Sequence, residues 1–167
     1  MITVLVRARR GPEALAVTLS ALVPAVAAGL VGDAVVLSES PDRAVERVAD
    51  AAGATLIAGH GASWREGARV ARHEWLLCLD DGDVPEEGWI RVLERFVALG
   101  PRAGRLGRLR RRHPGILPGL RDLVRGLARR GEVRAGDLVH RRVLLEGQRP
   151  GRPVRIAAAV ARDPAFG

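Results

Sequence analysis

The 167-residue chain contains no lysine and no tyrosine, one cysteine, three tryptophans and two phenylalanines. A single cysteine cannot form an internal disulfide, and Cys78 lies inside an apolar run, so we expect a core thiol in a reducing compartment. Without lysine, the chain has no Gly-Lys-Ser/Thr phosphate loop. The few aromatic residues do not form the stacking surface of a known nucleic-acid module, so nucleic acid is not an expected partner.

The chain also lacks a long uninterrupted hydrophobic run. Residues 15–30 are the most apolar stretch, but they are short for a span and contain Thr18, Ser20 and Pro24. We therefore expect a buried helix there rather than a membrane span. No signal peptide is evident, because strand-like residues open the chain. These features together predict a cytoplasmic protein.

All 27 basic residues are arginine, and they are unevenly distributed. Residues 1–100 hold 10 arginines and 14 acidic residues, whereas residues 101–167 hold 17 arginines and 5 acidic residues. The second half is thus expected either to face phosphate or anionic lipid or to be a solvated surface. Residues 117–130 have an amphipathic pattern, which predicts a helix at the inner membrane face or a helix packed on its own domain.

Short apolar segments alternate with helical patterns through the first hundred residues. Strands are expected at residues 2–6, 34–37, 54–57 and 75–79, and a helical pattern follows each of them. Ser40 is the expected N-cap of the second helix. Four such βα units predict an α/β fold, a mostly parallel sheet with helices on both faces. Beyond residue 100 we expect a basic loop or edge strand (105–114), a strand and short helix (133–145) and a strand (154–160).

Three aspartates, Asp80, Asp81 and Asp83, come directly after the apolar run at residues 75–79. The carboxyl end of a buried strand is the usual place for a ligand site in an open α/β sheet. Carboxylates this close repel one another, so a cation between them would be stabilising. The alternative is an acidic turn that caps the following helix.

The order of these features in residues 2–100 resembles the nucleotide-sugar-binding half of the family 2 glycosyltransferases, which have the GT-A fold. The matching pieces are an acidic, serine-containing turn (38–42), a small-residue helix containing Gly67, and an Asp-rich turn followed by Pro and Gly-Trp (79–89). The resemblance implies a GT-A-like (Rossmann-like) sheet. Residues 1–100 would then be the donor-binding half, and residues 101–167 a basic, arginine-rich extension of the same domain with a reduced acceptor half.

The resemblance also implies a reaction and a cofactor. A sugar would pass from a nucleotide diphosphate donor to an unknown acceptor, assisted by Mn²⁺ or Mg²⁺ bridging the two phosphates. The implied metal ligands are Asp81 and Asp83. Because Gly82 stands where the commonest family motif has its second Asp, Asp80 with Asp83 is the other ligand pair. Donor contacts are expected from Arg7, Arg9, Ser38, Glu39, Asp42, Arg65, Asp80 and Asp81.

The catalytic base is not assigned by the sequence. The family supplies a carboxylate well after the Asp-rich turn, and the remaining candidates here are Asp137, Glu146 and Asp163. Two other hypotheses stay open. One is a catalytically silent GT-A-like binding or regulatory module, and the other is a nucleotidyltransferase of similar fold, whose glycine-rich loop with a lysine is not found here.

Overall fold

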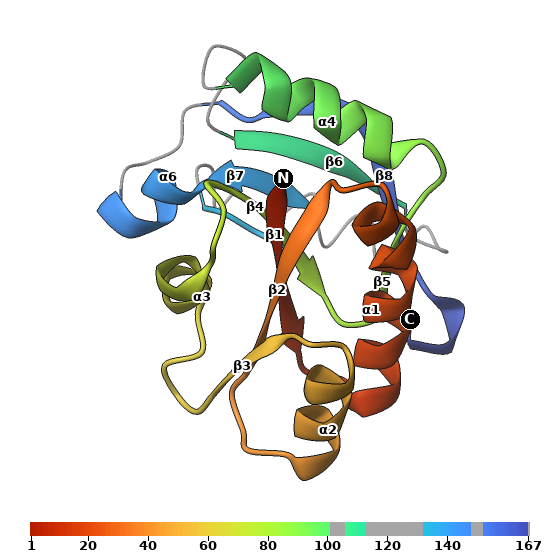
Figure 1. Ribbon diagram of the computed structural model, residues 1–167, viewed down its shortest axis with the longest axis vertical. Coiled ribbons are helices and arrows are strands. Elements are labelled where there is room, and N and C mark those ends of the chain that lie inside the picture. Colours follow the sequence, from red (N-terminus) through yellow and green to blue (C-terminus); the bar gives the residue numbers. More distant parts are fainter. Residues whose placement is uncertain (101–105, 113–131, 148–151, 167) are drawn as a thin grey trace.

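A computed structural model describes residues 1–100, 106–112, 132–147 and 152–166. Its strands form one eight-stranded sheet in the order β3-β2-β1-β4-β7-β6-β8-β5 (Figure 1). Their bounds are β1 (Ile2–Ala8), β2 (Val31–Ser38), β3 (Thr55–Ala58), β4 (Trp75–Asp80), β5 (Asp83–Pro85), β6 (Leu106–Arg112), β7 (Asp137–His140) and β8 (Val154–Arg162).

The sheet combines a parallel half with a mixed half. β1 pairs parallel with both β2 and β4, and β2 pairs parallel with β3, as the four βα units predict. β7 is antiparallel to both β4 and β6, β6 is parallel to β8, and β5 is antiparallel to β8. The expected α/β fold is therefore confirmed. The expectation of a loop or edge strand for β6 is wrong, because β6 lies inside the sheet between β7 and β8.

Helices cover both faces of the sheet (Figure 1). They are α1 (Pro12–Ala27), α2 (Arg43–Ala51), α3 (Trp64–Val70), α4 (Trp89–Leu99) and α6 (Arg141–Glu146), with a short 3-10 helix η2 (Pro164–Phe166). Val4 and Val6 on β1 belong to the core under α1, α2 and α4, whereas Leu5 belongs to the core under α3 and α6. This alternation follows from the two-residue period of a strand, and it explains why β1 is apolar on both sides.

The start of α2 differs from the sequence-based prediction. Asp42, not Ser40, is the N-cap, and its carboxylate accepts hydrogen bonds from the backbone N–H groups of Ala44 (2.7 Å) and Val45 (3.5 Å). Ser40 instead uses its carbonyl oxygen to accept a hydrogen bond from the Ser38 hydroxyl, 2.6 Å away. Both residue types are good caps, so local preference alone does not choose between them.

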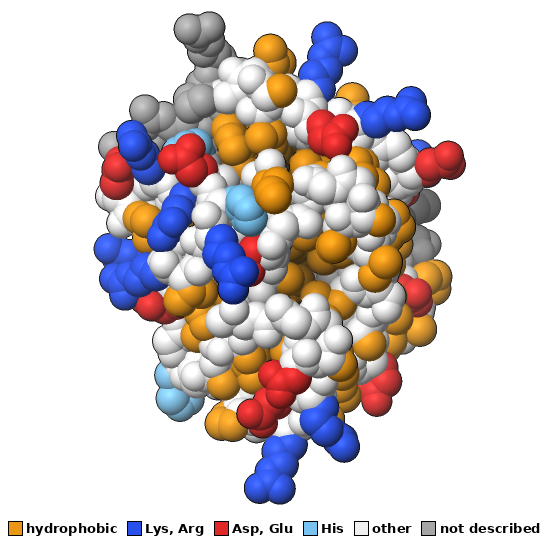
Figure 2. Space-filling view, viewed as in Figure 1, with side chains coloured by type: hydrophobic (Ala, Val, Ile, Leu, Met, Phe, Trp, Pro, Cys, Tyr) orange, Lys and Arg blue, Asp and Glu red, His pale blue; other side chains and the backbone are white. Residues whose placement is uncertain are grey.

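No helix within the described ranges is long and apolar enough to cross a membrane. On the face drawn in Figure 2, arginine and acidic side chains lie next to one another around the periphery. The amphipathic segment at residues 117–130 lies outside the described residues. Its contact with anionic membrane therefore stays a prediction.

Gly107 on β6 is a position where a Cβ atom would force the neighbouring side chains to move. A Cβ atom there would lie 2.2 Å from Cδ1 of Ile156 and 3.0 Å from Cζ of Phe96. We expect Gly107→Ala to lower the free energy of unfolding by about 1–3 kcal/mol, the usual cost of overpacking, as measured by urea denaturation. Gly61→Ala is the matched control, because a Cβ atom at Gly61 would meet nothing within 4 Å. Equal urea midpoints for the two variants would contradict this packing.

Candidate functional site

The candidate site lies where several strands end at one edge of the sheet. β1, β4, β6 and β8 all run in the same direction, and β5 begins at the edge where they finish. Arg7, Asp80, Arg111 and Arg162 stand at or near these strand ends, and Asp83 opens β5. In the sheet, β1 lies between β2, the next strand in the chain, and β4. Such a switch in strand order creates the crevice in which open α/β sheets bind ligands.

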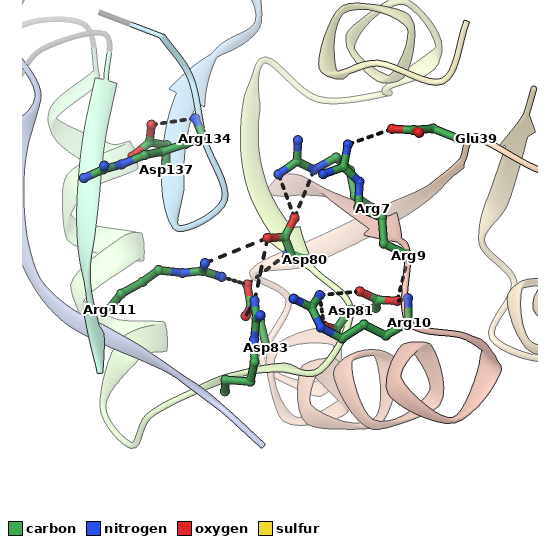
Figure 3. A network of polar contacts seen from close by, with 11 residues as sticks. Arg7, Arg9, Arg10, Glu39, Asp80, Asp81, Asp83, Arg111, Arg134 and Asp137 are labelled. Carbon is green, nitrogen blue, oxygen red and sulfur yellow. Dashed lines mark hydrogen bonds and ion pairs between the residues drawn. The ribbon is translucent and has the colours of Figure 1, made fainter. Parts of the chain in front are cut away.

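Asp80 is the most accessible aspartate of the Asp-rich turn, with 14% of its side chain exposed. Its Oδ1 accepts a hydrogen bond from Nε of Arg7 (2.9 Å) and forms an ion pair with Nη2 of the same side chain (2.8 Å). The Arg7 guanidinium also stacks 4.4 Å from the ring centroid of Trp64. Oδ2 of Asp80 faces Arg111 at 3.8 Å (Figure 3). It also faces Arg162 at 3.7 Å. Arg7 is thus held in place by both a carboxylate and an indole.

Asp81 is fully buried and organises the connection between β1 and α1. Its Oδ2 accepts hydrogen bonds from the backbone N–H groups of Arg9 (2.7 Å) and Arg10. Its Oδ1 pairs with Nη1 of Arg10 at 3.0 Å. Both oxygens therefore already have donors within the protein.

Asp83 is also buried, and it lies between two arginines from distant strands. Its Oδ2 accepts hydrogen bonds from the backbone N–H of Asp80 (2.9 Å) and from Nη2 of Arg111. Its Oδ1 accepts a hydrogen bond from Nη2 of Arg162 at 3.1 Å. Asp83 thus ties the Asp-rich turn to β6 and β8.

Gly82 completes the turn in a backbone conformation that favours glycine, with φ at +78°. Its N–H donates to the carbonyl of Ala14 (3.0 Å), and its carbonyl accepts from the N–H of Asp163 (2.9 Å). A Cβ atom at this position would lie 3.2 Å from Cβ of Phe166. The turn is consequently fixed between α1 and the segment that follows β8.

These residues form one polar network, the arginine–aspartate cluster, which we define as Arg7, Arg10, Arg111 and Arg162 with Asp80, Asp81 and Asp83 (Figure 3). Four guanidinium groups face three carboxylates, which leaves one net positive charge. The sequence predicted a cation here because three neighbouring carboxylates repel one another. In the folded chain, arginines already offset this repulsion.

The same geometry decides how well the cluster suits a divalent cation. Mg²⁺ requires near-octahedral oxygen coordination, and such ions need carboxylate oxygens that are free to coordinate them. Every oxygen of Asp81 and Asp83 accepts a hydrogen bond from an N–H group. Among the described residues, no group of three or more His, Cys, Asp or Glu side chains is arranged to hold a metal. As folded, the engaged oxygens of Asp81 and Asp83 do not fit Mn²⁺ or Mg²⁺, and Asp80 adds only its Oδ2, which accepts no hydrogen bond from the described residues. Both ligand pairs, Asp81 with Asp83 and Asp80 with Asp83, stay predictions.

The other residues expected to bind the donor are only partly brought together. Arg9 reaches across to Glu39 at 2.7 Å, and this hydrogen bond and the Arg9 charge lower the pKa of the Glu39 carboxyl. Ser38 is buried at the end of β2. Asp42, the α2 cap, lines a hollow of about 440 Å³, and Arg65 is exposed on α3. Arg7, Arg9, Asp80 and Asp81 therefore gather at one place, whereas Asp42 and Arg65 lie outside the described network.

The candidate bases occupy three different environments. Asp137 is fully buried, and its carboxylate accepts hydrogen bonds from Nε (2.7 Å) and Nη2 (2.8 Å) of Arg108 and from the N–H of Arg134 (3.0 Å). Glu146 is exposed at the end of α6. Asp163 accepts a hydrogen bond from the N–H of Ala165 at 2.9 Å. Asp137 thus holds β6 against β7, and a role as base stays a prediction for all three.

Cys78 is buried beside Asp137, as expected for a core thiol. Burial, and secondly the nearby Asp137 charge, raise the pKa of the Cys78 thiol well above its usual value. The thiol therefore stays protonated and is a poor nucleophile.

Sequence reasoning missed three members of the cluster, namely Arg10, Arg111 and Arg162. Arg111 stands 28 residues after Asp83 and Arg162 stands 79 residues after it. The available signal was the excess of arginine after residue 100, together with the strand pattern at residues 154–160. That signal does not reveal which way β6 and β8 run, so it could not place their ends beside Asp83.

No protein-family model matches the chain, and no curated protein sequence does. Solved structures do. Glucosyl-3-phosphoglycerate synthase from Mycobacterium tuberculosis, solved with Mn²⁺ and UDP-glucose, is similar with a TM-score of 0.60 and 18% identity, over 86% of this chain and 57% of that one. Mannosyl-3-phosphoglycerate synthase from Rubrobacter xylanophilus is similar with a TM-score of 0.63 and 12% identity, over 98% and 67% of the respective chains.

These similarities show the fold, which is the GT-A type that the sequence predicted. The chain spans about 57% of the length of the mycobacterial synthase. The expectation of Mn²⁺ or Mg²⁺ agrees with the solved structures of this fold, since the mycobacterial synthase was solved with Mn²⁺ in one case and with Mg²⁺ and UDP in another.

Proposed function

We propose that the chain binds a nucleotide diphosphate sugar at the carboxyl ends of β1 and β4 and transfers the sugar to an acceptor. The observation that carries this proposal is the arginine–aspartate cluster, which presents guanidinium groups at the switch point of a GT-A sheet. The solved structures support it, since the mycobacterial glucosyl-3-phosphoglycerate synthase, which has a similar fold, was solved with UDP-glucose.

The chain's own residues would act by binding and charge stabilisation. Planar guanidinium groups present paired N–H donors that match phosphate oxygens. Arg7 is already fixed by Asp80 and Trp64, so little conformational freedom remains for it to lose when a donor binds. Preorganised positive groups at the diphosphate would stabilise the negative charge that develops as the sugar leaves.

A silent binding module is the second candidate, and one observation favours it. Asp137, the candidate base on β7, is buried and paired with Arg108, an arrangement that favours a structural role over deprotonation of an acceptor. Two further parts of the proposal rest on the sequence pattern. The first is the division into a donor half (1–100) and a reduced acceptor half (101–167). The second is a cytoplasmic location with peripheral contact to anionic membrane.

Calorimetric titration with UDP and GDP, each with and without Mn²⁺, tests the proposal. We expect saturable binding of at least one nucleotide to the wild type and about tenfold weaker binding to Arg7→Gln, because a charge-assisted hydrogen bond contributes about 1.5–3 kcal/mol. Arg69→Gln, which changes an exposed arginine paired with Glu66, is the control and should bind as the wild type does. Absence of heat under every condition would reject the donor site.

If a nucleotide binds, a hydrolysis and transfer assay on the corresponding nucleotide sugar then separates the two candidate functions. Release of nucleotide diphosphate would identify an enzyme. Tight binding without release would favour the silent module.

A further inference from the structure

We infer that the guanidinium groups of Arg111 and Arg162, together with Arg7, neutralise the donor diphosphate in this chain without a divalent cation. This inference rests on the proposed function and deepens it, because it assigns the chemistry that binds the diphosphate.

The first support is that the oxygens of Asp81 and Asp83 already have donors within the protein, and that Oδ2 of Asp80, which accepts no hydrogen bond from the described residues, faces two guanidinium groups at 3.7 and 3.8 Å. Asp83 is buried, and it accepts hydrogen bonds from Arg111, Arg162 and the backbone. Removing the guanidinium partners of a buried carboxylate is unfavourable, because it leaves an uncompensated charge inside the protein. A cation at Asp83 would have to compete with two guanidinium groups for the same oxygens.

The second support is the space at Gly82, where the commonest family motif has an acidic residue. The positive φ at Gly82 strains any other residue, and the space that a Cβ atom would occupy is adjacent to Phe166. Backbone hydrogen bonds to Ala14 and Asp163 fix the turn in this position. The folded chain therefore has no acidic side chain at position 82, and Phe166 lies close to the space that such a side chain would need.

The third support is that the arginines retain unused donors. Each guanidinium carries five N–H groups. Nε of Arg162 has no hydrogen-bond partner among the described residues, but it is buried, so the donors within reach of a ligand are on the exposed part of the side chain. The side chains of Arg111 and Arg162 are still 24% and 18% exposed, so part of each can reach a ligand. Asp83 thus orients the two arginines and leaves donors for the phosphates.

Charge balance agrees with this assignment. The cluster has one net positive charge before a ligand arrives, contributed by four arginines against three aspartates. A diphosphate is negatively charged, and the extra guanidinium group offsets part of that charge. Because the cluster is partly buried, solvent and salt screen this attraction less than they would in water. A cation added to the same cluster would instead increase the existing positive charge.

The test is calorimetry with UDP as the probe, or GDP if only GDP binds, once with excess EDTA and once with Mn²⁺. We expect the same affinity in both buffers, within about twofold. Arg111→Gln should weaken binding about tenfold or more in EDTA. Arg110→Gln is the matched control, because Arg110 is exposed, directly precedes Arg111 on β6 and points to the other face of the strand.

Arg111→Lys keeps the inference testable if Arg111→Gln does not fold. Lysine keeps the charge beside Asp83 but lacks the planar fork, so we expect a folded protein by circular dichroism with weakened binding in EDTA. Wild-type affinity in Arg111→Lys would overturn the inference. Binding that appears only with Mn²⁺ would overturn the inference and leave the proposed function intact. Absence of nucleotide binding in both buffers would overturn the proposed function together with the inference.

Discussion

Replacing Asp83 by asparagine is expected to lower the free energy of unfolding by about 3–5 kcal/mol, because it removes the buried carboxylate that pairs with two partly buried arginines. In the native protein Asp83 pairs with Arg111 and Arg162 and also accepts the backbone N–H of Asp80. Asparagine retains one acceptor oxygen, but it carries no charge to offset the guanidinium groups. The loss should appear as a lower urea midpoint by circular dichroism with an unchanged slope.

Glu86→Gln is the matched control for Asp83→Asn. It removes the charge of a carboxylate that pairs with the exposed Arg112 at 3.1 Å. Such surface pairs contribute about 0–1 kcal/mol, so the urea midpoint of this variant should barely move. If Asp83→Asn were as stable as the wild type and instead lost Mn²⁺ binding, the original prediction of Asp83 as a metal ligand would hold.

Asp137→Asn is expected to have a stability effect of similar size, about 3–5 kcal/mol. Asp137 is fully buried, and Arg108 donates to both of its oxygens at 2.7 and 2.8 Å. The substitution leaves the Arg108 charge inside the sheet and weakens the junction between β6 and β7. Thermal and urea denaturation measure this loss, and UDP binding below the unfolding transition should remain.

Glu146→Gln is the control for Asp137→Asn, since it changes the exposed member of the same set of candidate bases. Its stability should stay within about 0.5 kcal/mol of the wild type, as is usual for surface substitutions. The alternative outcome is informative. If Asp137→Asn kept its stability but abolished sugar transfer, Asp137 would be the base and the structural role described above would be wrong.

Local sequence patterns were sufficient for the parallel half of the fold. The β-branched run from Ile2 to Val6 and the apolar run at residues 75–79 predicted β1 and β4, and both strands are observed. Their position follows from a general rule, because consecutive βα units form right-handed crossovers and place strand ends at one edge. The Asp-rich turn therefore had to lie at the carboxyl end of β4, where it is found.

Sequence patterns were less informative in three places, namely β6, β5 and the start of α2. β6 is rich in arginine and therefore resembled a loop or an exposed edge, although it lies inside the sheet. β5 has only three residues, which is too short for any periodicity to show. The choice of Asp42 over Ser40 as the cap of α2 was likewise decided by the path of the chain rather than by residue preference.

The sequence by itself determined that Asp80, Asp81 and Asp83 stand together at a strand end, since they are neighbours in the chain. Only the tertiary structure decided what those carboxylates contact. Arg7 lies 73 residues before Asp80, and Arg162 lies 79 residues after Asp83. Such partners meet because strands pair in a particular order, direction and register, and these depend on the packing of the whole sheet. A turn that suggested a cation site from its neighbours in sequence is, once folded, a set of carboxylates paired with arginines.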